Sequence, residues 1–174
     1  MLEYFTVDDY YAIKPDDMTI WELIKGSFLM SPSPTLNHQE ILGKLYLIFG
    51  TYFKNQKCKC FISPIDVRLG DSIVNPDLCV ICDESKITKQ QCVGAPDLII
   101  EITSSNVKRD TQIKFNLYEE YGVKEYWIVN PINKSIQQYH LQNNEFSFIC
   151  NVGITNAISS VLFPDISFNV SDVL

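Results

Sequence analysis

The 174-residue sequence lacks any hydrophobic run long enough to cross a membrane. Its longest apolar stretches, such as Leu45–Phe49, fall far short of the ~20 residues that a membrane helix needs. The first four residues, Met-Leu-Glu-Tyr, also lack the basic and apolar segments of a secretory signal. We therefore expect a cytoplasmic protein without membrane contact, folded as a single domain over residues 1–174.

Positive charge is scarce as well. The chain has 14 Lys and Arg residues against 21 Asp and Glu, a formal net charge of -7 and a pI near 4.7. Proteins that hold nucleic acid non-specifically are usually basic, because phosphate contacts dominate that affinity. A nucleic-acid function would have to depend on local charge and metal ions, and the overall balance counts against it.

Several common catalytic signatures are missing too. The sequence has no GxSxG elbow, no P-loop and no Cys/His arrangement typical of cysteine hydrolases. It also has no repeat, linker or low-complexity segment. With 46% hydrophobic residues, the composition is that of an ordinary globular domain.

Six cysteines are present, and their spacing gives little support for zinc. Cys79 and Cys82 form a CxxC pair, but they fall in an apolar segment that we interpret as a buried strand. Residues three apart on a strand point to opposite faces, so this pair cannot chelate one ion. We therefore expect the cysteines to be reduced thiols without structural zinc.

Hydrophobic periodicity and turn residues predict the elements. A short helix begins after Thr6, a hairpin turns at Lys25-Gly26, and a long amphipathic helix covers about 35–55. Strands are predicted at about 61–68, 76–82 and 97–103, then a helix ending before Gly122, and then strands at about 125–130, 135–141 and 145–149. The last 20 or so residues cannot be assigned.

This order predicts an α/β fold. Its core runs helix, three strands, helix, strand, which is expected to form a central mixed sheet flanked by helices. The N-terminal hairpin and the C-terminal strands are additions to that core. The strands before and after the second helix are expected to pair in parallel through a right-handed crossover.

Charged groups interrupt the apolar pattern at three places. Asp77 follows Pro76 at the start of one apolar strand, and Glu101 lies inside another, where an unpaired charge is costly. Lys114 shares a helical stripe with Asp110 and Tyr118 at four-residue spacing. Two carboxylates at neighbouring strand ends suit Mg²⁺, which is held by one or two carboxylates with water and phosphate. A nearby lysine could orient water and stabilise charge on phosphorus.

At these residues the chain resembles the PD-(D/E)XK nuclease superfamily, and within it a family of small stand-alone bacterial proteins assigned as restriction endonucleases. The segments that carry the resemblance are Trp21–Gly26, Ser31–Pro34 with His38, Asn75–Asp77, Ala95–Ser104, the Asp110, Lys114 and Tyr118 stripe, and Gly122–Pro131. They cover nearly the whole chain in the family's order and spacing.

The resemblance implies a restriction endonuclease-like α-β-β-β-α-β core. It also implies a metal-dependent endodeoxyribonuclease with Mg²⁺ (or Mn²⁺) held by Asp77, Glu101 and the backbone carbonyl of Ile102. The products would be 5′-phosphate and 3′-hydroxyl ends. Thr103 stands where the superfamily has its lysine, and the family's lysine falls on Lys114 instead.

Four further residues are accessory candidates, each with a purely structural alternative. His38 is either a partly buried structural histidine or part of the cleft, and Glu22 is either a hairpin surface residue or an extra acid at the site. Tyr118 either packs or hydrogen-bonds the site, and Asp110 either pairs with Lys114 on a solvated face or steers it. Asp97, in a second Pro-Asp pair, is interpreted as structural.

The leading hypothesis is thus a Mg²⁺-dependent DNA endonuclease, with a homodimer expected because cutting both strands needs two sites. A catalytically silent nucleic-acid-binding or interaction module with the same fold is the alternative, favoured by the net charge and by Thr103. A weaker third hypothesis is another hydrolase that uses Asp77 and Glu101 as an acid/base pair.

Overall fold

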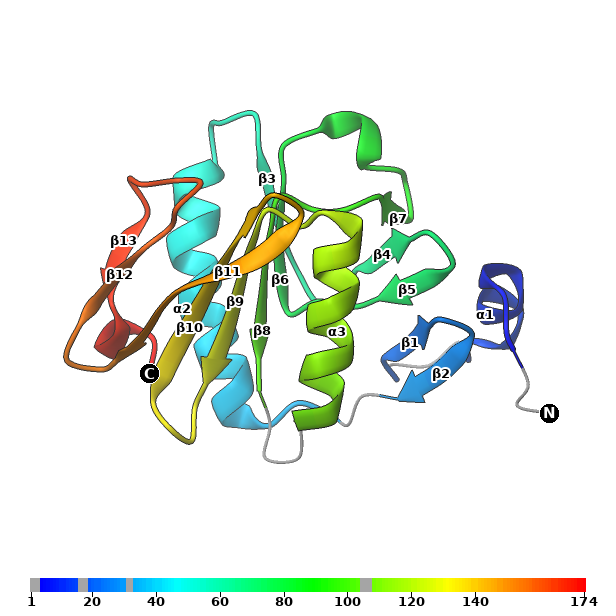
Figure 1. The fold of residues 1–174 in the computed structure, drawn as a ribbon, viewed down its shortest axis with the longest axis horizontal. Coiled ribbons are helices and arrows are strands. Elements are labelled where there is room, and N and C mark those ends of the chain that lie inside the picture. The colour runs from blue at the N-terminus through cyan, green and yellow to red at the C-terminus, as the bar shows by residue number, and fades with distance from the viewer. Residues whose placement is uncertain (1–3, 16–18, 31–32, 104–107) are drawn as a thin grey trace.

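The computed structural model describes residues 4–15, 19–30, 33–103 and 108–174, with the backbone alone for 108–111. Figure 1 shows the arrangement of its elements. In chain order they are α1 (Val7–Ile13), β1 (Trp21–Ile24), β2 (Ser27–Met30), α2 (Leu36–Phe53), β3 (Lys59–Ile62), β4 (Asp66–Leu69), β5 (Ser72–Val74), β6 (Leu78–Ile81), η1 (Glu84–Lys86), β7 (Gln91–Val93), β8 (Leu98–Ile102), α3 (Lys108–Tyr121), β9 (Glu125–Asn130), β10 (Ser135–Gln142), β11 (Glu145–Gly153), β12 (Ala157–Ser159), β13 (Ser167–Asn169) and η2 (Val170–Asp172).

A six-stranded sheet in the order β11-β10-β9-β8-β6-β3 forms the centre of the molecule. Strands β8 and β9, which flank α3 in sequence, pair in parallel, and the other neighbours pair antiparallel. Helices α2 and α3 cover opposite faces of this sheet (Figure 1). The expected core order is therefore confirmed as α2, β3, β6, β8, α3 and β9.

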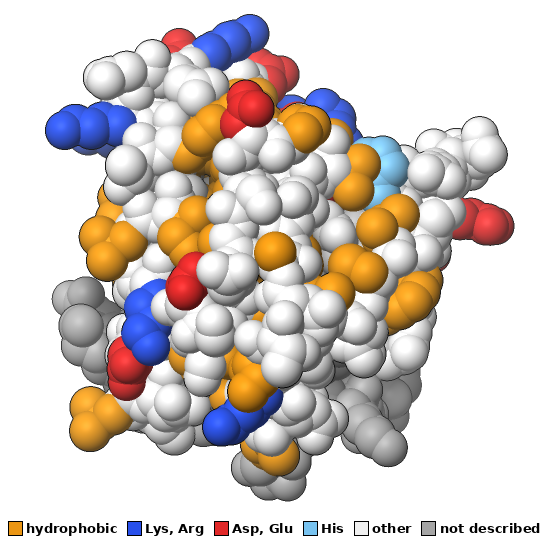
Figure 2. Space-filling model, turned by 90° about the vertical axis from the view of Figure 1, so that its left-hand side faces the viewer, with side chains coloured by type: hydrophobic (Ala, Val, Ile, Leu, Met, Phe, Trp, Pro, Cys, Tyr) orange, Lys and Arg blue, Asp and Glu red, His pale blue; other side chains and the backbone are white. Residues whose placement is uncertain are grey.

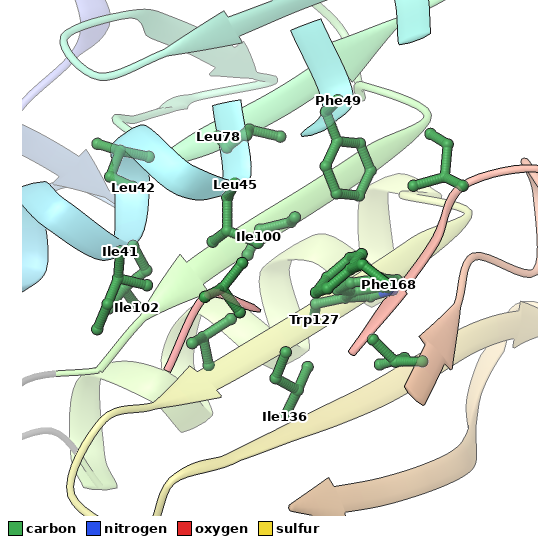
Figure 3. Close-up of a cluster of buried hydrophobic side chains, with 14 of the residues drawn as sticks. Ile41, Leu42, Leu45, Phe49, Leu78, Ile100, Ile102, Trp127, Ile136 and Phe168 are labelled. Carbon is green, nitrogen blue, oxygen red and sulfur yellow. The ribbon is translucent and has the colours of Figure 1, made fainter. Parts of the chain in front are cut away.

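Helix α2 buries one apolar stripe against the sheet. The Thr35 hydroxyl accepts a hydrogen bond from the His38 N–H and caps the first turn. The stripe comes from residues three and four apart, which share one side of a helix. Figure 3 shows Ile41, Leu42, Leu45 and Phe49 of α2 facing Leu78, Ile100, Ile102, Trp127, Ile136 and Phe168.

Helix α3 packs on the other face, and its contact differs in one respect from the prediction. Leu117 is buried, and Tyr118, placed by its spacing in the polar stripe, is fully buried as well. The helix ends at Gly122, whose positive φ of 82° suits glycine. The Val123 N–H then donates to the Tyr118 carbonyl.

A second, five-stranded sheet in the order β2-β1-β5-β4-β7 stands beside the core. It corrects the single strand predicted over 61–68, because β3 belongs to the central sheet and β4 to this one. The chain changes sheets at Ser63-Pro64, where proline has no N–H for a strand ladder. The short strands β5 and β7 were not predicted.

The C-terminal segment, unassigned from sequence, forms the β12–β13 hairpin and η2. Ile158, Ile166 and Phe168 join the cluster beneath α2, so this segment closes one side of the core. Figure 2 looks at that side, where hydrophobic side chains lie in small scattered groups. In the described residues, no helix is long and apolar enough to span a membrane.

The expectation that all cysteines are reduced is wrong for two of them. A disulfide joins Cys58 and Cys82, whereas Cys60, Cys79, Cys92 and Cys150 are free. Strands β3 and β6 pair with Lys59 opposite Ile81, so the flanking residues Cys58 and Cys82 are the next facing pair. The partner of Cys82 was therefore set by strand pairing and not by its CxxC neighbour. Cys79 is buried and free, as predicted.

Candidate active site

Asp77 and Glu101 meet at one end of the central sheet. Strands β6 and β8 pair antiparallel with Leu78 opposite Ile100, so the residues that follow in the register are Asp77 and Glu101. One carboxylate oxygen of Asp77 accepts a hydrogen bond of 2.7 Å from the Ile102 N–H, beside Glu101. The structure thus places the two acids on adjacent strands, as expected.

Lys114 reaches this pair from α3. Its ammonium lies 3.1 Å from Glu101 Oε1 and 2.8 Å from Glu22 Oε1, and its side chain is only 14% exposed. The Tyr118 hydroxyl, one helical turn later, donates to the same Glu101 oxygen at 2.6 Å. Of the two alternatives for Tyr118, the structure shows the hydrogen bond to the site.

Glu22 is a buried member of the cluster and not a surface residue of the hairpin. Strand β1 carries it into the interior, where the residue is 3% exposed. Its Oε1 atom accepts from the Asn75 N–H at 2.7 Å in addition to contacting Lys114. Glu22 therefore links the second sheet to the charged end of the central sheet.

His38, in the first turn of α2, reaches the site from the opposite face of the sheet. Its Nε2 atom lies 3.1 Å from Asp77 Oδ1. Its buried Nδ1 atom has no hydrogen-bond partner in the described part of the chain. The hydrogen bond to Asp77 raises the pKa of His38 above its usual value, although burial opposes this. The structure thus places His38 at the candidate site, beside Asp77, and not remote from it.

The cluster holds more negative than positive charge. Three carboxylates, from Glu22, Asp77 and Glu101, face one ammonium, that of Lys114, and the titratable imidazole of His38. Burial, together with the neighbouring Asp77 and Glu22, raises the pKa of Glu101 to about 7 in spite of Lys114 and Tyr118. Burial lowers the pKa of Lys114, but Glu101 and Glu22 outweigh it and raise that pKa overall, so the lysine is charged.

A divalent cation would fit this charge imbalance. Among the described side chains, no three of His, Cys, Asp or Glu gather as a ready-made metal cage, and Lys114 occupies the space between Glu22 and Glu101. Two carboxylates, Asp77 and Glu101, are left as candidate ligands, with the Ile102 carbonyl as a third. That set suits Mg²⁺, which keeps waters and takes phosphate oxygens for the rest of its octahedron.

Two further acids complete the set of candidates. The side chain of Asp110 lies outside the described residues. Asp97 is structural, as predicted, because it accepts from the Cys82 N–H at 2.7 Å and from Lys124 at 2.6 Å.

Sequence analysis assigned no role to Asn75, although this residue lies in a segment that carries the resemblance. Its side chain accepts from Ser63 and from the Ile65 N–H and donates to Asp66. It thereby fixes the segment that leads into Asp77. Its place directly before Pro-Asp was the only signal in the sequence.

Comparisons with known proteins agree with this geometry. A family model described as "Putative restriction endonuclease" (Uma2) matches residues 7–171. The chain is also similar to the crystal structure of "a putative nuclease belonging to DUF820 from Anabaena variabilis ATCC 29413", with a TM-score of 0.78 and 20% identity over 97% of both chains. At that identity the likeness establishes the fold alone, and no curated protein matches.

The restriction endonuclease-like fold expected from the sequence is thereby confirmed. The family model covers all but a few residues at each end, including every described member of the charged cluster. This chain belongs to the Uma2 family of restriction endonuclease-like proteins.

Proposed function

We propose that the protein is a Mg²⁺-dependent endonuclease that hydrolyses phosphodiester bonds in DNA. The observation that supports this most is the buried cluster of three carboxylates and one lysine at the strand ends. A buried site with surplus negative charge is costly unless a cation neutralises it. A family assigned to restriction endonucleases and a nuclease-titled structural neighbour agree with this chemistry.

In this proposal Asp77 and Glu101 hold the ion, with the Ile102 carbonyl as a further ligand. Mg²⁺ bound there would neutralise charge on the scissile phosphate and lower the pKa of an attacking water. The Ile102 N–H fixes one oxygen of Asp77, and Tyr118 fixes one oxygen of Glu101. The second oxygen of Glu101 has no contact within the described residues, whereas the second oxygen of Asp77 lies 3.1 Å from His38 Nε2.

Lys114 supplies the positive charge that the protein itself contributes. Its ammonium is held between Glu22 and Glu101, so it is fixed next to the place where the phosphate would lie. A fixed cation there can orient the attacking water and stabilise negative charge that develops on phosphorus. Glu22 positions this ammonium from behind, because its other contact is the Asn75 N–H of the supporting loop.

The silent-module alternative makes a different prediction for the same cluster. A fold that has lost catalysis would bind nucleic acid without needing Mg²⁺ at Asp77 and Glu101. The third hypothesis, an acid/base hydrolase, would use Glu101 protonated near pH 7, and its activity would survive removal of all divalent ions.

Calorimetric titration with Mg²⁺ and Mn²⁺ tests the metal site directly. We expect binding to the wild type and none to Glu101→Ala, with Lys44→Ala as the control because its partner Glu40 lies on the outer surface of α2. No binding by the wild type at millimolar metal would favour the silent module.

Cleavage of plasmid and linear DNA then separates chemistry from metal binding. Lys114→Ala is expected to fold and to bind Mg²⁺, yet to cleave at least ~100-fold more slowly, as when one transition-state donor is removed. Wild-type cleavage by this variant at saturating Mg²⁺ would remove Lys114 from the mechanism. Cleavage of both strands in one event would support the expected homodimer. Cleavage of genomic DNA would agree with the expected cytoplasmic location.

A further inference from the structure

A row of paired residues crosses the central sheet from the candidate active site toward one edge. Glu101 on β8 pairs with Ile128 on β9. Ile128 pairs with Gln137 on β10, and Gln137 pairs with Asn151 on β11. Side chains paired across neighbouring strands lie on the same face of a sheet. Gln137 and Asn151 therefore lie on the face of Glu101, roughly 10 Å and 14 Å away at ~4.8 Å per strand.

Exposure to solvent increases along this row. Ile128 is buried, Gln137 is half-buried and Asn151 is exposed. Neither the Gln137 nor the Asn151 side-chain amide has a hydrogen-bond partner within the described residues. Neighbouring amides do have partners: Asn130 accepts from two N–H groups of its own turn, and Gln138 donates to Glu125 and Ser159. Other exposed amides, such as Asn143 and Asn144, also lack a partner among the described residues, so Gln137 and Asn151 are distinguished by their register with Glu101.

A parallel row of aromatic residues lies beside it on the same face. Tyr126 pairs with Tyr139, and Tyr139 pairs with Phe148 on β11. The rings of Tyr139 and Phe148 are in contact, with centroids 5.6 Å apart. Phe148 is 58% exposed although it continues a buried aromatic stack. The sheet edge thus presents an exposed ring next to an exposed amide.

These groups suit a nucleic-acid strand with unpaired bases. Aromatic rings stack with any base, and Asn and Gln amides both donate and accept hydrogen bonds at base edges. The row carries no charge beyond Glu101, so a polyanion would not be repelled along it. For a chain with net charge -7, uncharged contacts are a suitable way to hold DNA because phosphate attraction is weak.

We propose that Gln137, Asn151 and Phe148 bind the DNA strand on one side of the cut, with an unpaired base stacked on Phe148. This substrate-strand row rests on the proposed nuclease function. It adds a preference for DNA with unpaired bases near the cleavage position. At the ~3.4 Å per base of a stacked strand, the row reaches about three or four nucleotides from the scissile phosphate, and fewer in an extended strand.

Steady-state cleavage and fluorescence anisotropy test this proposal together. The probes are a labelled single strand and the blunt duplex of the same sequence, with anisotropy measured in EDTA so that binding does not depend on cleavage. Phe148→Ala is expected to weaken single-strand binding roughly 5- to 100-fold, the loss of one stacked base, and to raise KM with little change in kcat. Phe148→Trp should retain binding, and the double variant of Gln137→Ala and Asn151→Ala should weaken it further.

Leu47→Ala and Asn55→Ala are the matched controls. Leu47 is 68% exposed on α2, which covers the other face of the sheet, and Asn55 follows the end of α2 remote from His38. Both should match the wild type. If the wild type cleaves DNA but Phe148→Ala and the double amide variant bind the single strand as the wild type does, the substrate-strand row is wrong and the proposed nuclease function is unaffected. Binding without any wild-type cleavage would support the row and contradict the nuclease.

The molecular mass, measured by light scattering, tests whether this sheet edge is instead an interface between two copies of the chain. Strand β11 is the outer strand of the sheet, and such strands can pair with a second copy. If Phe148→Ala converts a dimer into a monomer and DNA binding falls only for that reason, the edge is an interface between copies and the proposal is wrong. An unchanged mass with weakened binding supports it.

Discussion

The two ends of the central sheet each bury carboxylates, but only one end satisfies its carboxylate fully with hydrogen bonds. At the end where β9 begins, Glu125 is fully buried and accepts hydrogen bonds from five uncharged groups. These donors are the Trp127 ring N–H, the Gln138 amide, the Ser160 hydroxyl, the Val161 N–H and the Leu162 N–H. At the other end, Glu101 and Glu22 share one lysine, and Asp77 contacts His38.

This difference separates a structural acid from a candidate functional one. Five donors satisfy Glu125 completely, so it needs no ligand and ties β9 to the C-terminal segment. Glu101 has two donors and two negative neighbours, and its pKa is raised to about 7 because burial and like charge disfavour its ionised form. Burial alone does not indicate function, whereas burial with incomplete compensation does.

The largest expected effect tests the structural end. Glu125→Ala leaves five donors without their acceptor, and each unsatisfied buried group costs about 1–3 kcal/mol. We expect the free energy of unfolding, measured by urea denaturation, to fall by at least about 4 kcal/mol. This is less than the sum of five such costs because water can reach some of the donors. Glu101→Ala, which removes an acid of the same length, should cost far less. Equal losses for the two variants would contradict the comparison.

The disulfide also belongs to the structural end, at the end of β6 remote from Asp77. It closes a loop of 24 residues between Cys58 and Cys82. Such a loop contributes about 3 kcal/mol by restricting the unfolded chain. Cys58→Ser should lose that amount in an oxidising buffer and nothing in dithiothreitol, whereas Cys60→Ser, with a free thiol, should be insensitive to the reductant. A wild type that is equally stable in both buffers would show that the bond does not form in solution.

The pH dependence of stability tests the charged end. Glu101 has a folded-state pKa of about 7 against an ordinary value of 4.5. The folded state therefore binds the Glu101 proton more tightly than the unfolded state does. The resulting contribution to folding stability is complete below pH 4.5 and is lost as the pH rises through 7. In EDTA, the wild type should lose about 2 kcal/mol relative to Glu101→Gln between pH 5 and pH 8. A difference in unfolding free energy between the two proteins that does not change with pH would mean that folding does not raise the pKa of Glu101.

The same two ends differ in how well the sequence predicted them. Glu101 was identifiable because a charge inside an apolar strand has no cheap structural explanation, and Asp77 and Lys114 followed from the resemblance. The burial of Glu22 could not be predicted, because it depends on how the second sheet packs against the first. Nor could the bond between Cys58 and Cys82, which requires knowing that β3 pairs with β6. Local patterns predicted the elements, but contacts between elements distant in sequence could not be inferred.

The smallest expected effect concerns Tyr118, which connects the buried core of α3 to the site. Its hydroxyl donates to Glu101 at 2.6 Å, and this hydrogen bond stabilises the ionised carboxylate. Tyr118→Phe removes the donor while keeping the ring, so stability should change by only about 1 kcal/mol. The pKa of Glu101 should rise further, because burial and the negative neighbours would then act with less opposition. The proposed Mg²⁺ binding requires the ionised form, so its midpoint in a pH titration should move to higher pH in Tyr118→Phe. Tyr121→Phe, on the same helix, should leave the midpoint unchanged, and a shift of equal size there would show that α3 packing and not the hydroxyl controls the acid.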